Sequence, residues 1–322
     1  MSRRPLPLLL LPLVLAGCPS EATWEEAFDA STEGALSGVW GSGPDDVWIV
    51  GGWMDEAQIF HFDGADWGES EAPDVPLLAW VVGWGPDSAL SVGVDGAAAS
   101  WDGNAWTALD TGVDGDLWGV WGASPDDVWI VGGDAGDPDS EPILLHYDGS
   151  TFTDVGLDPE QNTRDASALF KVFGVGGRVW AVGQGGLLVE KQGDDWVAVG
   201  AGAEANQDFV SLWGPSADTV VAVGGRGNAR LSTWDGATWS TIAPEGVGGL
   251  NAVFMEDASR AIVGGISGYV GAFDPATGEL EPEAVLGTED VHAIWGDGEG
   301  THYAVGGRFS EPLSGLAAVR TE

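Results

Sequence analysis

The amino-acid sequence predicts an all-β fold, a seven-bladed β-propeller, from three observations. A phrase typified by residues 36–52, LSGVWGSGPDDVWIVGG, occurs seven times at intervals of 39 to 51 residues. Most copies are followed by a second motif, an Asp-Gly pair between an apolar run and an aromatic residue. The chain also contains 52 glycines and 18 tryptophans, which is typical of short strands joined by tight turns. A repeat near 42 residues has the length of one four-stranded propeller blade.

The first half of each repeat predicts a hairpin of two inner strands. In the first copy, VWG and VWIVG are apolar runs joined by the turn sequence GPDD. The run Val47–Val50 is apolar at successive positions, which indicates a strand buried on both faces. Such burial is expected of a blade packed between two others. The copies end at Gly51, Gly93, Gly132, Gly183, Gly224, Gly264 and Gly306. The longest spacing contains an insertion near 134–142 and a longer stretch over 154–168.

The second half of each repeat predicts strands 3 and 4. IFHFDGADW (59–67) and LSTWDGATW (231–239) place Asp-Gly between two runs, a strong hairpin signal. The seventh repeat stops after three strands, whereas ATWEEAF (22–28) reads like a fourth strand with no blade of its own. We therefore expect the N-terminal strand to complete the last blade and close the ring, which also pairs an exposed edge.

The first 17 residues predict a secretory signal. Arg3 and Arg4 precede an apolar run over 6–15 that is too short for a spanning helix of about 20 residues. Leu15-Ala16-Gly17-Cys18 resembles the bacterial lipobox. The resemblance implies cleavage after Gly17 and attachment of a diacylglyceryl group to Cys18, the sole cysteine.

This interpretation predicts one domain after a signal peptide, and a location for it. We expect a signal peptide over 1–17 and a single propeller domain over 18–322. The lipid on Cys18 would anchor the propeller outside the cytoplasm to a bacterial membrane, at the outer membrane or the cell surface.

The charge of the chain excludes nucleic-acid binding as a function class. The net charge is −40, from 11 Lys+Arg against 51 Asp+Glu, and removal of Arg3 and Arg4 makes it −42. Such a surface repels phosphate backbones. It is consistent with a solubilising secreted surface or with binding of divalent cations. The best calcium candidates are Asp134, Asp137, Asp139 and Glu141, which lack the glycine of a calcium loop, so we predict neither a metal nor another cofactor.

Antiparallel blades place the loops between strands 2 and 3, and those joining blades, on one face. These loops vary in sequence, whereas the turns on the opposite face are short and repetitive. Variable loops on a rigid scaffold are where binding usually occurs. The residues predicted to contact a ligand are Trp53, Met54, Asp55, Asp137, Asp139, Arg226 and Arg308.

The residues that most resemble catalytic or metal-binding groups are interpreted as structural. The pairs Asp45-Asp46 and Asp126-Asp127 follow proline in a turn, where aspartate bonds to local backbone. His61 and His146 occupy the same repeat position, which favours a packing role over a ligand role. We find no nucleophile, phosphate-binding or dinucleotide motif in a supporting context, and we predict no catalytic residue.

The repeat VWG-x-x-PDDVWIVG followed by DG-x-x-W resembles the propeller repeats of secreted bacterial lipoproteins, distant relatives of Asp-box, kelch and WD-repeat propellers. The resemblance covers nearly all of 22–322 and implies a fold, not an activity. We expect a non-enzymatic binding or scaffold module with a protein or glycan ligand. Two alternatives stay open: a hydrolase or lyase acting on glycans with acids at the ring centre, and a calcium-stabilised structural surface protein.

Overall fold

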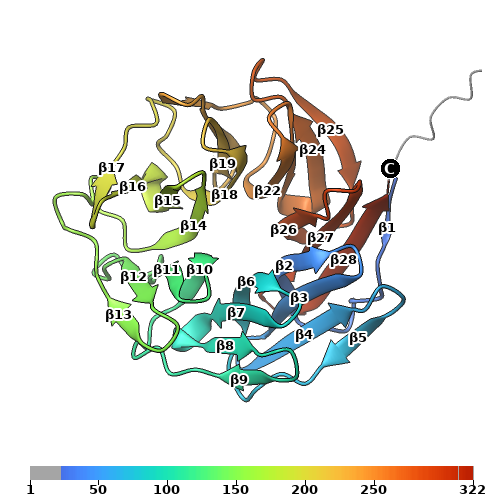
Figure 1. Ribbon diagram of the computed structural model, residues 1–322. Helices are drawn as coiled ribbons and strands as arrows, with labels where there is room; N and C mark the ends of the chain where they lie inside the picture. The colour runs from blue at the N-terminus through green and yellow to red at the C-terminus, as the bar shows by residue number, and fades with distance from the viewer. Residues whose placement is uncertain (1–22, 311, 322) are drawn as a thin grey trace, which may run out of the picture.

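A computed structural model describes residues 23–310 and 312–321 of the chain. In that part, seven antiparallel sheets of four strands are arranged in a ring around a central axis (Figure 1). The predicted seven-bladed propeller is confirmed. No helix in the described part is long and apolar enough to cross a membrane. The predicted signal peptide and Cys18 lie outside the described residues.

The blades follow one another in chain order, each running from its inner to its outer strand. Blade 1 contains β2 (Ala35–Gly43), β3 (Asp46–Trp53), β4 (Glu56–Phe62) and β5 (Trp67–Ser70). Blade 2 contains β6 (Leu78–Gly85), β7 (Ser88–Gly93), β8 (Ala98–Trp101) and β9 (Trp106–Ala108). Blade 3 contains β10 (Leu117–Ser124), β11 (Asp127–Gly132), β12 (Ile143–Tyr147) and β13 (Phe152–Asp154).

The remaining blades repeat this order. Blade 4 contains β14 (Leu169–Val175), β15 (Arg178–Gly183), β16 (Leu188–Gln192) and β17 (Asp195–Ala198). Blade 5 contains β18 (Phe209–Ser216), β19 (Thr219–Gly224), β20 (Arg230–Trp234) and β21 (Trp239–Ile242). Blade 6 contains β22 (Leu250–Asp257), β23 (Arg260–Gly265), β24 (Tyr269–Phe273) and β25 (Leu280–Val285). Blade 7 contains β26 (Asp290–Gly296), β27 (Thr301–Arg308), β28 (Ser314–Thr321) and β1 (Trp24–Glu26).

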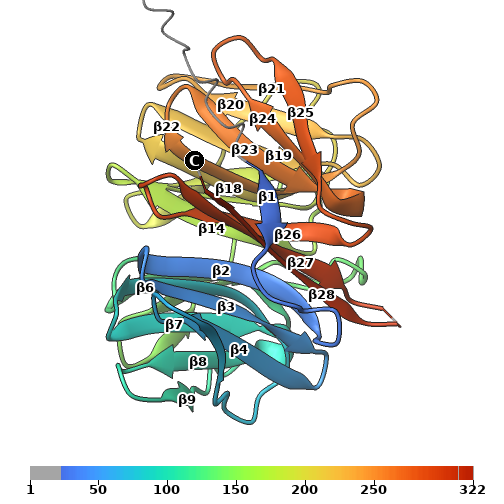
Figure 2. The same ribbon diagram turned by 90° about the vertical axis from the view of Figure 1, so that its right-hand side faces the viewer.

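The N-terminal strand closes the ring as the sequence predicts. β1 pairs antiparallel with β28, with Trp24 opposite Arg320 and Glu26 opposite Ala318. The pairing continues where the amide of Ala27 donates to the carbonyl of Ala317 at 3.0 Å. Figure 2 shows β1 lying along β28 on the side of the ring. Because both ends of the described chain meet in one blade, opening the ring requires breaking this pairing.

The VWG phrase is explained by packing between neighbouring blades. The aromatic ring at the end of one inner strand covers the glycine of the next inner strand. A Cβ atom at Gly83 would lie 2.3 Å from the ring of Trp40, and one at Gly174 would lie 2.4 Å from the ring of Trp121. Only glycine permits this approach. The tryptophan of one blade packs on the glycine of the next blade, so the two residues recur together in the repeat.

In blades 2, 4 and 6, the loop between strands 2 and 3 forms a hydrogen bond to the next blade. These loops contain the single-turn 3-10 helices η1 (Val94–Gly96), η2 (Gln184–Gly186) and η3 (Ile266–Gly268). In each, a backbone amide donates to an aspartate just before or at the start of the next inner strand. The pairs are Asp95 to Asp116 at 3.1 Å, Gly185 to Asp208 at 2.9 Å and Ser267 to Asp290 at 2.8 Å. These acids of the loop face therefore hold blades together.

Candidate binding site

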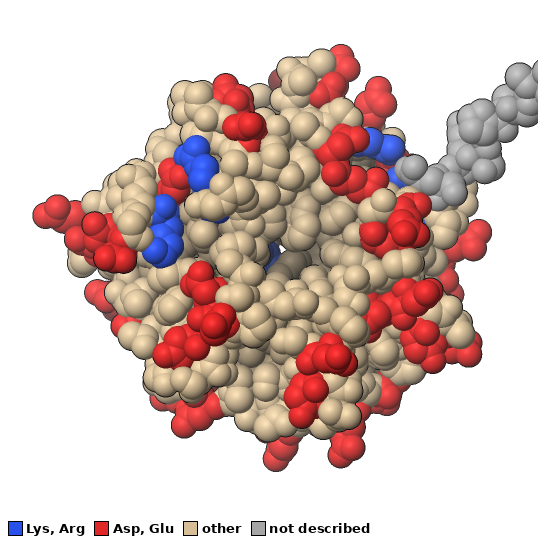
Figure 3. All heavy atoms as spheres, in the orientation of Figure 1, with Lys and Arg blue, Asp and Glu red and all other residues tan. Residues whose placement is uncertain are grey.

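A cavity of 320 Å³ opens on the propeller axis at the face that carries the variable loops. Each of the seven inner strands contributes to its wall near its first residues. The contributors, one from each blade, are Ser37, Ala79, Trp118, Phe170, Val210, Asn251 and His292. Figure 3, a view along the axis, shows the hollow at the centre of the ring and acidic side chains gathered toward the outside. The axis is thus the place where all blades meet.

The walls of this axial cavity are mainly apolar and aromatic. Trp80, Trp118, Phe170 and Phe309 line it. The indole nitrogen of Trp118 donates to the carbonyl of Gly133 at 2.9 Å, which fixes its ring. Phe309 lies just after β27 and is 44% exposed, an unusual position for a large apolar side chain. Apolar walls with a few polar groups are typical of ligand sites.

Lys171 on β14 is the distinctive polar group of the axial cavity. The residue is only 6% exposed, and its Nζ atom lies 2.7 Å from the centroid of the Trp80 ring. Among the described residues, that amine takes part in no hydrogen bond and no ion pair. Burial lowers the pKa of the Lys171 amine well below its usual range. The face of Trp80 acts in the opposite direction, because it favours the ammonium form.

Lys171 and Trp80 occupy one repeat position in blades 4 and 2. This position comes directly before two apolar residues of the inner strand, such as Val39 and Trp40 in blade 1. In the other five blades it holds a small residue. Those residues are Gly38, Gly119, Ser211, Ala252 and Ala293. Of the seven residues at this position, only the two large ones, Trp80 and Lys171, line the axial cavity. Sequence reasoning missed Lys171, although its departure from the repeat was a usable signal.

Two other titratable groups line the axial cavity, and both are engaged by neighbours. The Nε2 atom of His292 donates to the carbonyl of Gly307 at 3.0 Å, and burial lowers the pKa of this imidazole. A neutral His292 therefore serves as a hydrogen-bond donor there. Asp290 accepts the amide of Ser267, as described above.

A second, smaller hollow of 190 Å³ continues along the axis toward the short-turn face. Its wall contains tryptophans of the VWG phrase, namely Trp40, Trp121, Trp213 and Trp295. Lys171 and Trp80 line both hollows. The lysine therefore lies at the inner end of the axial cavity, where the aromatic hollow begins.

The residues predicted to contact a ligand are distributed over four blades instead of forming one site. Arg226 in blade 5 is 66% exposed, and its Nε atom lies 2.7 Å from Asp208. Arg308 in blade 7 pairs with Glu289 at 2.6 Å and directly precedes Phe309 of the axial cavity. Both guanidinium groups thus have carboxylate partners within the propeller.

The predicted contact residues of blades 1 and 3 lie at loop tips. Trp53 ends β3 opposite Glu56 in the β3–β4 hairpin, and Met54 in its turn is 50% exposed. Asp55 borders a separate hollow between this hairpin and the stretch 69–75. In blade 3, Asp137 accepts the amide of Asp139 at 2.9 Å.

The acidic loop of blade 3 makes local turns. The carboxylate of Asp134 accepts the amide of Gly136 at 2.8 Å. Among residues 23–310 and 312–321, no three His, Cys, Asp or Glu side chains are grouped so that they could hold a metal ion. The four calcium candidates 134, 137, 139 and 141 are therefore not brought together.

The acids of the repeated turns take part in packing networks. Asp46 accepts hydrogen bonds from Ser42 at 2.5 Å and from the indole of Trp48 at 3.1 Å, and its carboxylate lies 2.7 Å from His61. The rings of Trp48 and His61 stack with centroids 4.0 Å apart. The equivalent pair in blade 3, Asp127 and His146, is 3.0 Å apart.

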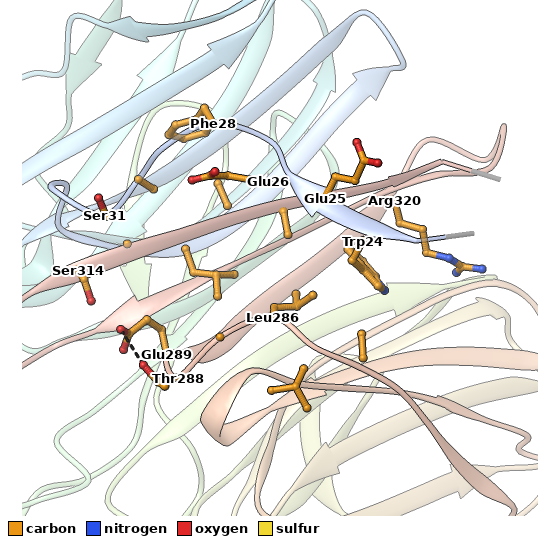
Figure 4. A pocket seen from close by; sticks show the side chains of 18 of the residues that line it. Trp24, Glu25, Glu26, Phe28, Ser31, Leu286, Thr288, Glu289, Ser314 and Arg320 are labelled. Carbon is orange, nitrogen blue, oxygen red and sulfur yellow. Dashed lines mark hydrogen bonds between the residues drawn. The ribbon is translucent and has the colours of Figure 1, made fainter. Parts of the chain in front are cut away.

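A larger hollow of 1200 Å³ lies at the outside of the ring, between the outer strands of blades 6 and 7. Figure 4 shows Trp24 and Phe28 near β1, with Leu286 and Glu289 on the opposite wall. Outer strands of neighbouring blades diverge in any propeller, and this groove follows that divergence. Its acid Glu289 is already engaged by Arg308 and by the hydroxyl of Thr288 at 3.2 Å.

Comparison with known proteins identifies the fold. No family model and no curated protein matches the chain. Among solved structures, YCF48 from Cyanidioschyzon merolae is similar with a TM-score of 0.67 and 13% identity, over 93% of this chain and 98% of that one. The chain is a β-propeller.

Two further solved structures support the same assignment. YCF48 bound to D1 peptide has a TM-score of 0.67 and 12% identity, over 92% of this propeller and 96% of that chain. The WD40 β-propeller domain of Doa1 has a TM-score of 0.68 and 11% identity, over 93% of this propeller and 97% of that domain. At such identities the likeness shows the fold alone.

Proposed function

We propose that this propeller is a non-enzymatic binding module and that its axial cavity receives a segment of a partner protein. The observation that carries the proposal is Lys171, a buried amine without a partner among the described residues, in an aromatic cavity to which all seven blades contribute. The volume of 320 Å³ lies at the low end of about 300–1,000 Å³ typical of ligand sites.

A peptide fits this site better than a glycan. Aromatic and aliphatic walls suit apolar side chains, and one of the similar propellers, YCF48, is described as bound to D1 peptide. Hydrolysis of a glycoside commonly uses two carboxylates that face one bond. Among the described residues lining the axial cavity, Asp290 is the one carboxylate, and it is engaged by Ser267. This arrangement favours binding over glycan chemistry.

We also propose that the module is anchored outside the cytoplasm through Cys18. The lipobox resemblance supports this, and only five residues separate Cys18 from the start of β1 at Trp24. The propeller would then sit close to the membrane with little freedom to move away. In cells, Cys18→Ser should move the protein from the membrane fraction to the soluble fraction. Unchanged membrane association of Cys18→Ser would refute the anchor.

The binding proposal is tested by filling the axial cavity. Val210 on β18 lines it, so Val210→Trp should block entry of a peptide. Ile242 on β21 lies in the same blade, at the outside and 36% exposed, so Ile242→Trp is the matched control. Random peptides displayed on phage with a free C-terminus are selected on the wild-type propeller and then measured on both variants.

We expect peptides selected on wild type to lose binding at least 30-fold to Val210→Trp and to bind Ile242→Trp normally. Asn251→Trp, which fills the cavity from blade 6, should repeat the loss. Thermal melting of each variant controls for folding. Equal binding to folded cavity-filled variants and to wild type would contradict the proposal.

A further inference from the structure

We propose that the partner peptide enters the axial cavity by its C-terminus and that Lys171 receives the terminal carboxylate. The inference rests on the proposed function and adds the chemistry of the recognised group. The cavity has a cationic side chain at its inner end and apolar and aromatic side chains along its walls.

The state of Lys171 calls for an anionic ligand. The chain has two lysines, Lys171 and Lys191, and the second donates a hydrogen bond to the carbonyl of Gly193. Lys171 lacks such a bond among the described residues and faces the ring of Trp80. A buried charge without a partner is costly, so an arriving carboxylate stabilises the ammonium form and is itself attracted.

Among the described residues on the cavity wall, Lys171 is the group that can pair with the carboxylate. The flanking inner strands β10 and β18 present Trp118 and Val210 to the cavity. Across the axis, β26 presents Asp290 and His292, which are engaged by the backbone of Ser267 and Gly307. Lys171 is therefore the one Lys or Arg side chain on the cavity wall among the described residues. Ser37 and Asn251 are the neutral polar residues of the wall, and the side-chain amide of Asn251 donates to the carbonyl of Val291 at 3.3 Å.

The size of the cavity favours a chain end over an internal acid. An aspartate or glutamate within a peptide would need room for a strand that enters and a strand that leaves. The 320 Å³ cavity is near the minimum for a small ligand, and the hollow that continues past Lys171 offers only 190 Å³ between tryptophan rings to a strand that leaves. A C-terminus places its carboxylate at the inner end with one strand leading out, and its last side chains meet Trp80, Phe170 and Phe309.

The test compares peptide pools that differ only at the terminus. One pool has random apolar last three residues and a free carboxylate, and the other has the same residues and a C-terminal amide. We expect the propeller to retain the carboxylate pool at least tenfold more strongly than the amide pool. Lys171→Met, which keeps length and apolar contact with Trp80, should abolish this preference.

A spectroscopic measurement locates the contact. In Lys191→Arg the sole lysine is Lys171, so protein labelled with 13C at lysine Cε gives one side-chain signal. That signal should shift with the carboxylate pool and stay unchanged with the amide pool. Above the pKa of the empty lysine, affinity for the carboxylate pool should fall up to tenfold per pH unit, because binding takes up a proton. His292 also lines the cavity, so the pH series is repeated with the amide pool, which should not show this trend.

The outcomes separate this inference from the proposed function. Equal retention of both pools, with loss of both in Val210→Trp, keeps the binding module and refutes the carboxylate contact. Retention that is unaffected by Val210→Trp refutes the proposed function itself. If hexanoate shifts the Lys171 signal while the carboxylate peptide pool does not, the occupant is a small acid and the peptide terminus is wrong.

Discussion

The turn network around Asp46 and the axial site around Lys171 differ in how a charged group is paired. Asp46 is 19% exposed and lies within reach of three donors, from Ser42, Trp48 and His61. Lys171 is buried at 6% exposure and, among the described residues, has only an aromatic face beside it. The first arrangement holds a blade together, and the second leaves a charge to be satisfied from outside. The difference teaches that a polar group in a repeat indicates function when its own protein does not satisfy it.

The largest effect on stability is expected at Asp46. Asp46→Ala leaves the indole of Trp48 and the ring of His61 without their acceptor, which should lower the free energy of unfolding by about 2–3 kcal/mol. Asp45 is exposed in the same turn, and Asp45→Ala should change the free energy of unfolding by less than about 0.5 kcal/mol. Urea denaturation measures both. Equal effects would mean that the turn itself, and not the network, stabilises the blade.

Lys171→Met should have the opposite sign and raise stability. Because burial lowers the pKa of Lys171 in the folded state, the unfolded chain binds more protons between the folded and unfolded pKa values. Wild-type stability therefore gains with rising pH in that window, by at most about 1.4 kcal/mol per pH unit. The advantage of Lys171→Met should shrink from pH 7 toward pH 10. A gap independent of pH would show that desolvation of Lys171 is not its origin.

The equivalent acid in blade 3 should matter less than Asp46. Asp127 is 54% exposed and contacts His146 at 3.0 Å, so Asp127→Ala should cost about 0.5–1 kcal/mol. The two blades share the sequence PDDVWIVG, so this pair isolates the effect of burial and partner number. Guanidinium denaturation of the two variants side by side gives the comparison. A loss as large as that of Asp46→Ala would contradict the account.

The smallest effect is expected at Arg226, one of the residues predicted to bind a ligand. Its pair with Asp208 is exposed on the arginine side, so Arg226→Gln should change stability by about 0.5 kcal/mol or less. It should also leave retention of the carboxylate peptide pool unchanged, because Arg226 does not line the axial cavity. A marked loss of peptide retention would move the binding site toward the loop of blade 5.

The sequence predicted the ring well because its signals are local and repeated. Apolar runs such as Val47–Val50, Asp-Gly turns and the unmatched strand near Trp24 each specify pairing with a neighbour. The site was predicted less well. The variable loops lie on the predicted face, but Arg226 and Arg308 already have carboxylate partners there. The environment of Lys171 depends on Trp80 two blades away, and only a closed ring brings such residues together.

The most direct test of the axial site is the position at which a bound peptide can be crosslinked. A C-terminal carboxylate peptide selected from the pool carries a photoreactive phenylalanine analogue near its end, and mass spectrometry locates the crosslinked residues. We expect crosslinks around the axial cavity, at Val210, Asn251 and Phe309. Crosslinks in the groove between blades 6 and 7, at Trp24 or Leu286, would contradict this expectation.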